Sequence, residues 1–105
     1  MTATELIRVD PRSIIISDRL RDVDEDIVEA ICAVGLRDDL HPIIVRPMYE
    51  DGEALRRTEL HLVAGGHRLA AALRLQVEKI AVLQKPLDDD QARLVEIEEN
   101  MIRKD

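Results

Sequence analysis

Aromatic residues are almost absent from this chain of 105 residues: phenylalanine and tryptophan are missing, and Tyr49 is the one aromatic side chain. With 46% of the residues hydrophobic, a modest core must be built from isoleucine, leucine, valine and alanine. Cysteine is equally scarce. Cys32 stands alone, which excludes a disulfide within the chain, and its place in an aliphatic helical stripe predicts a buried or half-buried small residue, not a nucleophile.

Long apolar runs are missing too. No stretch approaches the roughly 20 residues that a membrane span needs, and no basic or apolar leader opens the chain. We therefore expect a single small domain in the cytoplasm.

A basic excess is also missing, because 22 aspartates and glutamates outnumber 15 lysines and arginines and give a net charge of −7. Eight carboxylates fall in residues 17–39 and six in residues 88–100. Domains that bind DNA usually carry a basic excess, since neutralised phosphates supply much of their affinity. We expect this chain alone to bind duplex DNA weakly or not at all at physiological salt. Most of the acidic residues are interpreted as solvated helix faces.

Hydrophobic periodicity predicts an alternation of strands and helices. The expected strands cover residues 6–9, 14–16, 43–45, 60–64 and 79–84. Pro11 separates the first two strands, Pro47 ends the third, and Asp51-Gly52 marks a turn in a loose tip. The pattern predicts an α+β fold, a small mixed sheet packed with about three or four helices.

Capping patterns place the helices. Asp24 is expected to cap a helix that runs to about Val34 and stops at Gly35. A second helix begins directly after Gly65-Gly66.

The last helix is expected to open with a capping box, in which Asp88 is followed three residues later by Gln91. Its apolar stripe is Leu94, Ile97 and Met101. Such a stripe is typical of the helix face that packs against a core.

Gly65-Gly66, between a strand and a helix, is the most informative feature of the chain. Two glycines leave backbone N–H groups uncovered at a helix start, which carries about half a positive charge. His67 and Arg68 follow in the first turn, where a cation is disfavoured. This arrangement favours a bound anion, typically phosphate, between the helix start and the basic side chains. The alternative is a tight turn with an incidental surface arginine.

The end of the chain is unusual because Glu96, Glu98 and Glu99 lie where the last helix ends, followed by Asn100 and Arg103. Carboxylates there face the negative end of the helix dipole. Either a cation, a metal or an arginine shares the site, or the helix end frays and the carboxylates are solvated. The chain also stops without a polar tail, which we interpret as the mark of a domain excised from a longer protein.

Four segments follow one another along the chain. They are an arginine-bearing loop before Val-Asp-Glu-Asp, Gly35-Leu36 with residues 41–46, residues 62–71 around Gly-Gly-His-Arg, and residues 99–105. In this order they resemble the N-terminal domain of ParB proteins, the partition factors of plasmids and chromosomes, within the ParB/sulfiredoxin superfamily. The resemblance covers nearly the whole chain and implies that fold.

The resemblance implies a nucleotide site. In ParB a Gly-Glu-Arg-Arg box cradles the triphosphate of CTP, and a Glu-Asn-x-x-Arg segment completes the pocket with magnesium. Gly65 and Arg68 match the first glycine and the second arginine of the box, and Glu99, Asn100 and Arg103 match the later segment. The implied ligand is thus a nucleoside triphosphate with Mg²⁺, held by Glu99 and Asn100.

Three positions depart from the ParB box. Gly66 replaces the glutamate, His67 the first arginine, and Ala70 a further arginine, so the phosphate cradle has fewer charges. Whether the ligand is CTP and whether it is hydrolysed are therefore both open. The resemblance also implies that either Arg19 or Arg21 is the basic residue of the arginine-bearing loop before Val-Asp-Glu-Asp. The predicted phosphate-binding residues are therefore Gly65, Gly66, His67, Arg68, Asn100, Arg103, Arg19 and Arg21.

Sulfiredoxin is the other relative, since its Gly-Gly-Cys-His-Arg signature shares the His67-Arg68 pair. Its catalytic cysteine would fall on Gly66, which has no sulfur, so sulfiredoxin chemistry is not expected. A nuclease, the activity after which some relatives are labelled, needs an activated water. The candidate cluster for its metal is Glu96, Glu98, Glu99 and Asn100.

Two hypotheses remain. One is a regulatory nucleotide-binding module of a DNA-associated protein, acting in partition or transcription, whose helical DNA-binding part follows residue 105 and whose ligand brings two copies together. The other is an enzyme, a weak nucleoside triphosphatase, phosphohydrolase or nuclease, using His67, Arg68 and the Glu99-Asn100 pair. The missing acid at position 66 favours the module.

Overall fold

The computed structural model describes residues 4–17, 22–36, 43–49 and 57–102. For residues 49, 57, 58 and 100–102 the backbone alone is described. Some predicted features lie outside these ranges: the turn at residues 51–52 and the side chains of Arg19, Arg21, Asn100 and Arg103.

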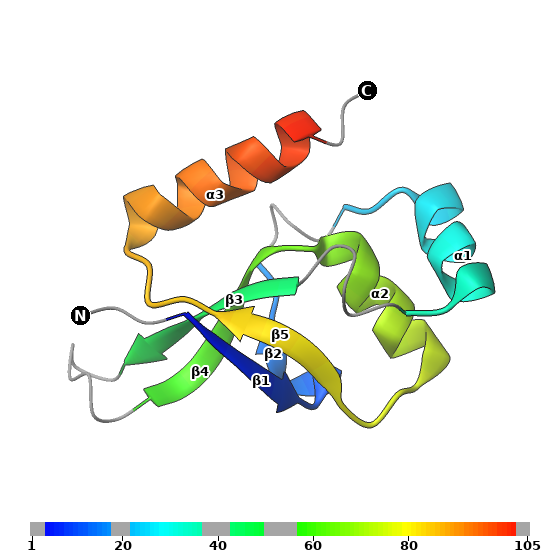
Figure 1. Ribbon diagram of the computed structural model, residues 1–105, viewed down its shortest axis with the longest axis horizontal. Coiled ribbons are helices and arrows are strands. Elements are labelled where there is room, and N and C mark those ends of the chain that lie inside the picture. Colours follow the sequence, from blue (N-terminus) through cyan, green and yellow to red (C-terminus); the bar gives the residue numbers. More distant parts are fainter. Residues whose placement is uncertain (1–3, 18–21, 37–42, 50–56, 103–105) are drawn as a thin grey trace.

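Five strands form one mixed sheet (Figure 1). The strands are β1 (Glu5–Val9), β2 (Ile14–Ile15), β3 (Ile43–Tyr49), β4 (Arg57–Ala64) and β5 (Ile80–Gln84). Their order across the sheet is β1-β5-β3-β4-β2. The β1–β5 and β3–β4 pairs are antiparallel, whereas β3–β5 and β2–β4 are parallel.

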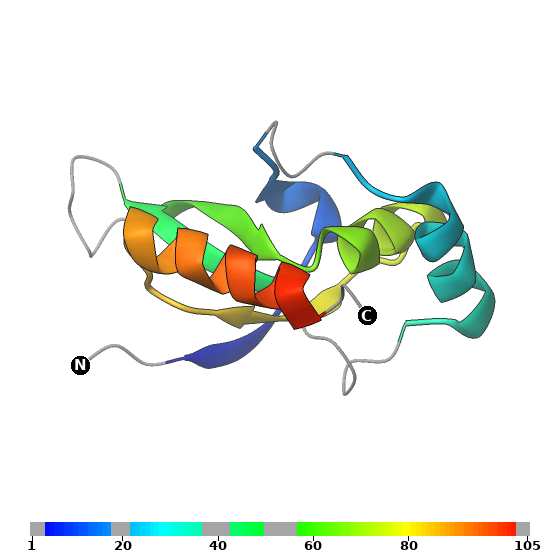
Figure 2. The same ribbon diagram turned by 90° about the horizontal axis from the view of Figure 1, so that it is seen from above.

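Three α-helices and one 3₁₀ turn complete the described part of the chain. They are η1 (Pro11–Ser13), α1 (Glu25–Val34), α2 (Gly66–Leu75) and α3 (Asp89–Ile102). Helices α1 and α2 lie together at one end of the sheet, and α3 lies apart from them, as the view from above also shows (Figures 1 and 2). The predicted α+β fold is confirmed. Among the described helices, none is both long and apolar enough to cross a membrane.

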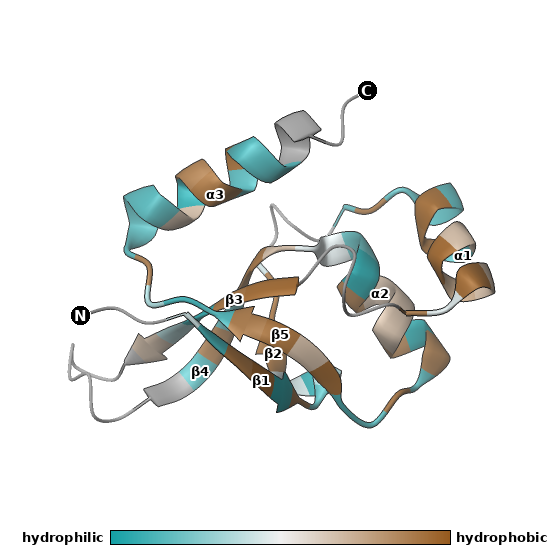
Figure 3. Cartoon of the chain, viewed as in Figure 1, coloured by the Kyte–Doolittle hydropathy of each residue, from teal (hydrophilic) through white to brown (hydrophobic). Residues whose placement is uncertain are grey.

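The core is aliphatic, as the lack of aromatic residues requires. Leu60 and Leu62 of β4 join Val45 and Val82 from the neighbouring strands, and Leu69 of α2 packs against them. His61 and Val63 of the same strand are not part of this cluster; they line a cavity below α3, together with Leu62. Strands are mostly brown in Figure 3, whereas much of α3 is teal. Helix α2 therefore reaches the core through Leu69, and α3 lies over the cavity lined by β3 and β4.

The predicted end of the third strand is wrong, because β3 continues through Pro47 to Tyr49. Proline has no N–H to give to a ladder and is confined to edge positions of sheets. Strand β5 pairs with β3 at Ile43–Val45. Beyond Val45 the described pairing of β3 is with β4, where Pro47 lies opposite Leu60, so the proline occupies an edge-like position.

Two of the capping predictions are confirmed. The carboxylate of Asp24 accepts the N–H of Asp26 at 2.9 Å, and Gly35 ends α1 with a φ of 95°. Before α3, the N–H of Gln91 donates to Asp88 Oδ1 at 2.7 Å and the N–H of Asp88 donates to Gln91 Oε1 at 3.0 Å, a complete capping box.

The predicted packing stripe of α3 is wrong. Leu94 is 57% exposed and Ile97 is 43% exposed, whereas Glu96 is 8% exposed. The face of α3 toward the sheet holds Asp89, Ala92 and Arg93, together with Glu96. Helix α3 thus meets the sheet through a largely polar face.

Candidate functional site

Gly65 forms the turn between β4 and α2, and two features require a glycine there. Its φ of 96° and ψ of 29° are left-handed, a conformation that other residues rarely adopt. A Cβ at this position would also lie 2.9 Å from the Cα of Ile43, a contact with backbone that no rotamer change relieves. The turn therefore lies directly against β3, at the edge of the core.

The start of α2 differs chemically from the starts of α1 and α3. Gly65, the N-cap of α2, makes no side-chain cap hydrogen bond, and the first turn of α2 contains no acidic residue. By contrast, Asp24 caps α1, and two acidic residues follow in its first turn. Helix α3 likewise has Asp89 and Asp90 in its first turn. In α1 and α3, carboxylates lie at the positive N-terminal end of the helix dipole, which stabilises them there. In α2 the same end has His67 and Arg68.

Arg68 is buried, with 9% of its surface exposed. The alternative of an incidental surface arginine at this turn is therefore wrong. Arg68 lies in the first turn of α2, directly before the fully buried Leu69. A buried guanidinium needs hydrogen-bond partners, so Arg68 contributes to the fold whatever else it binds.

His67 joins the starts of two helices. Its Nε2 accepts the backbone N–H of Asp24 at 3.0 Å, across 43 residues of sequence. Helices α1 and α2 are also joined by an ion pair of 2.6 Å between Arg74 and Glu25. The Glu25 carboxylate raises the pKa of Arg74 above its ordinary value through a hydrogen bond and charge attraction.

The predicted residues at the end of α3 have separate surroundings. Glu96 is buried and pairs with Arg93 at 3.4 Å, Glu98 is exposed, and Glu99 is half-buried. Among the described residues, no group of three or more histidines, cysteines, aspartates and glutamates could hold a metal. The magnesium site of Glu99 and Asn100 stays a prediction, since the side chain of Asn100 is not described.

The structure thus brings together one part of the predicted phosphate site. Gly65, Gly66, His67 and Arg68 are consecutive at the start of α2, and Asp24 joins them through His67. How Arg19, Arg21, Asn100 and Arg103 lie relative to this turn is outside the described part of the chain. Sequence reasoning predicted Asp24 as a helix cap but missed its contact with this turn, because nothing local connects a helix cap with a histidine 43 residues later.

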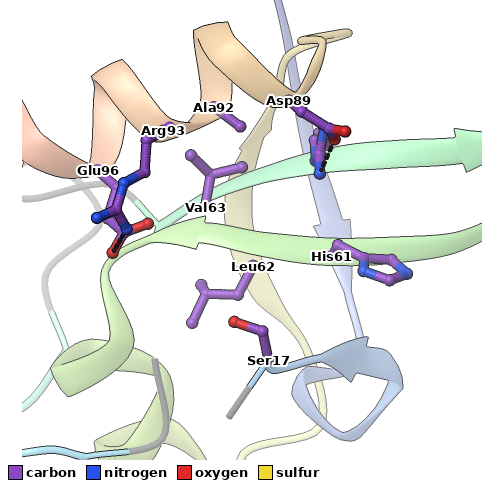
Figure 4. Close-up of a pocket in the computed structure, with 9 residues that line it drawn as sticks. Ser17, His61, Leu62, Val63, Asp89, Ala92, Arg93 and Glu96 are labelled. Atoms are coloured by element: carbon purple, nitrogen blue, oxygen red, sulfur yellow. Dashed lines mark hydrogen bonds and ion pairs between the residues drawn. The ribbon is translucent and has the colours of Figure 1, made fainter. Parts of the chain in front are cut away.

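A cavity of about 260 Å³ between α3 and the sheet was also missed (Figure 4). Arg46 and His61, which are directly opposite on β3 and β4, line it together with Ser17, and α3 closes it from above. Arg46 donates to the carbonyl of Leu87 at 3.2 Å and pairs with Asp89 at 2.8 Å. His61 contacts Glu59 at 3.0 Å. The charged residues Arg46 and Arg93 that line this cavity pair with Asp89 and Glu96, which also line it. The Arg46–Asp89 pair connects α3 to β3.

Cys32 lies in α1, with its Sγ 3.9 Å from the carbonyl oxygen of Ala71. Its partial burial confirms the expectation of a half-buried small residue. Ala71 is more than one turn beyond Gly66 in α2, so the sulfur is next to the middle of α2 and not at the glycine turn.

A five-stranded mixed sheet with a glycine turn leading into α2 defines a ParB/sulfiredoxin-like α+β domain. The chain belongs to the ParB N-terminal domain family, whose model matches residues 2–101. Among proteins with curated descriptions, no sequence matches the chain.

Solved structures with this fold include ParB from Caulobacter crescentus. A C-terminally truncated form complexed with CTP-γ-S matches with a TM-score of 0.70 and 24% identity, over 96% of this chain and 55% of that one. The form complexed to the centromeric parS site gives 0.69 and 25% identity, over 94% and 49%. The chain therefore spans about half the length of the ParB structures that it matches.

Sulfiredoxin from Arabidopsis thaliana matches with a TM-score of 0.62 and 20% identity, over 86% of this chain and 94% of that one. At this identity the likeness shows the fold alone. Gly66 stands where the sulfiredoxin signature has its cysteine.

Proposed function

We propose that this chain is the nucleotide-binding regulatory module of a ParB-like, DNA-associated protein, and that the turn at Gly65–Arg68 binds the phosphates. The observation that carries the proposal is the start of α2. Of the three described α-helices, α2 is the one whose first turn holds basic residues and no acidic one. Backbone N–H groups at such a start are donors suited to phosphate oxygens.

The family supplies the class of ligand. One ParB structure with this fold is a complex with CTP-γ-S, and another is a complex with the parS site. This likeness supports a nucleoside triphosphate as the proposed ligand, with CTP as the first candidate, and the resemblance of residues 99–103 to the ParB segment adds Mg²⁺ to the proposal. The phosphate contacts would come from the N–H groups at Gly65 and Gly66 and from Arg68, joined by Arg19 or Arg21, Asn100 and Arg103. Glu99 and Asn100 would hold the magnesium.

DNA recognition is assigned to a region outside these 105 residues, because their net charge is −7. Few phosphates can be neutralised by a domain with such a balance. In a band-shift series at physiological salt, the chain alone is expected to leave duplex DNA unshifted. Tight, sequence-specific binding by this chain would overturn the assignment of DNA recognition to a separate region.

Titration calorimetry with CTP, ATP and GTP, each with and without Mg²⁺, tests the proposal. Arg68→Lys keeps the positive charge and loses the planar fork that binds a phosphate through two N–H groups. We expect it to weaken nucleotide binding by about tenfold, or 1.4 kcal/mol. Arg12→Gln is the matched control, because Arg12 is half-exposed on η1 and pairs with Asp10.

Circular dichroism identifies variants that fail to fold, which matters because Arg68 is buried. Wild-type affinity in a folded Arg68→Lys variant would place the site elsewhere. Phosphate release during the titration with Mg²⁺ would favour the enzyme hypothesis over the regulatory module.

A further inference from the structure

His67 uses one ring nitrogen as a hydrogen-bond acceptor. The N–H of Asp24 donates to His67 Nε2 at 3.0 Å, so Nε2 carries no proton. A neutral imidazole has one donor and one acceptor, which leaves the proton on Nδ1. The histidine in the first turn of α2 is therefore uncharged in this arrangement, although its position corresponds to an arginine of the ParB box.

The donor, Asp24, is the N-cap of α1. Its own carboxylate is engaged within α1, where it accepts the N–H of Asp26 at 2.9 Å. The Asp24–His67 bond thus connects the N-cap residue of α1 to the first turn of α2. The Arg74–Glu25 pair joins the same two helices through surface side chains and does not involve the backbone at Asp24.

We propose that His67 is a positioning residue: its neutral ring holds the start of α1 beside the phosphate-binding turn, and it does not act as a cation that pairs with phosphate. The proposal rests on the proposed function in assuming that phosphate binds at the start of α2. Charge for the ligand then comes from Arg68 and the backbone N–H groups. Where the ParB box has an arginine that can pair with phosphate, this chain has a histidine that forms a hydrogen bond between α1 and α2.

Three replacements separate the two roles of residue 67. Glutamine has a carbonyl oxygen that can accept the N–H of Asp24 and carries no charge. Arginine restores the positive charge but has five donors and no acceptor, so it cannot make this bond. Alanine removes both. A positioning role therefore predicts that His67→Gln retains function and His67→Arg loses it, whereas a cationic role predicts the reverse.

The experiment measures two quantities on each variant. Hydrogen exchange follows the amide of Asp24 and the first turn of α1, and calorimetry follows the affinity for inorganic tripolyphosphate. We expect His67→Ala and His67→Arg to speed exchange of the Asp24 amide by about tenfold and to weaken tripolyphosphate binding, with His67→Gln close to wild type in both. Arg74→Gln is the control, because it breaks the other α1–α2 connection and leaves the Asp24 N–H bond intact.

Three results would overturn the proposal: an Asp24 amide as well protected in His67→Ala as in the wild type, faster exchange with unchanged tripolyphosphate affinity, or full affinity in His67→Arg. Failure of the proposed function has a different signature. In that case the wild-type protein itself does not bind tripolyphosphate, and the exchange rates still decide whether His67 holds the start of α1.

Discussion

Helices α2 and α3 both contact the sheet, yet they are held in opposite ways. Helix α2 packs through an apolar face, with Leu69 and Ala72 fully buried, and its first turn has no acidic residue. The other helix, α3, has a complete capping box at Asp88 and Gln91, and it meets the sheet through charged residues. Its apolar residue Leu94 faces solvent.

The difference bears on the proposed ligand site at the start of α2. The position of α2 is fixed by the core, so its start needs no cap for the helix to form. Helix α3 begins with its own capping box and contacts β3 through the Arg46–Asp89 pair. A self-capped helix start with three acidic residues repels an anion, whereas the basic start of α2 attracts one.

Among the replacements at the helix starts, Gly65→Ala gives the largest expected effect, because it acts on the turn that places the start of α2. The new Cβ would lie 2.9 Å from the Cα of Ile43, and alanine would have to adopt a φ of 96°. Strain and overpacking together predict a loss of about 3 kcal/mol in the free energy of unfolding. Urea denaturation followed by circular dichroism measures it.

Gly35→Ala is the matched control, since Gly35 also has a positive φ, 95°, and nothing lies within 4 Å of its Cβ position. Backbone strain alone should cost roughly half as much there. Equal losses in the two variants would mean that the close approach to Ile43 carries no energy.

Features encoded within a few residues could be predicted from the sequence. The cap at Asp24 and the capping box at Asp88 depend on side chains that bond backbone two or three residues away, and the glycine turn depends on the positive φ of Gly65 itself, so their residue types suffice. The fold class followed from the order of these elements together with the resemblance to the ParB N-terminal domain, which the family match supports.

Features that depend on distant neighbours could not be predicted. The burial of Arg68 is one of them, because its local pattern does not reveal what covers α2. The stripe of Leu94 and Ile97 has helical spacing, but spacing alone does not say which face meets the sheet. The bond between His67 and Asp24 crosses 43 residues, so no pattern in the sequence indicates it.

Asp88→Ala tests the other side of the comparison, the self-capped start of α3. The variant loses the acceptor for the N–H of Gln91 and should reduce the free energy of unfolding by about 1 kcal/mol. Thermal denaturation monitored by circular dichroism suits this measurement. Asp90→Ala removes an exposed carboxylate from the same turn and leaves the capping box intact. We expect it to change the free energy of unfolding by roughly a few tenths of a kcal/mol. If the two variants were equally stable, the capping box would not be what holds the start of α3.

Leu94→Ala has the smallest expected effect and tests the orientation of α3. Leu94 is 57% exposed, so its truncation should change the free energy of unfolding by less than about 0.5 kcal/mol. The same replacement at Leu69 of α2, which is fully buried, should cost about 2 to 5 kcal/mol. Urea denaturation of the two variants compares one residue type, in one kind of element, on the same sheet. A loss at Leu94 that approached the loss at Leu69 would mean that the apolar stripe of α3 faces the sheet, and that the polar contacts around Arg46 and Asp89 do not hold this helix.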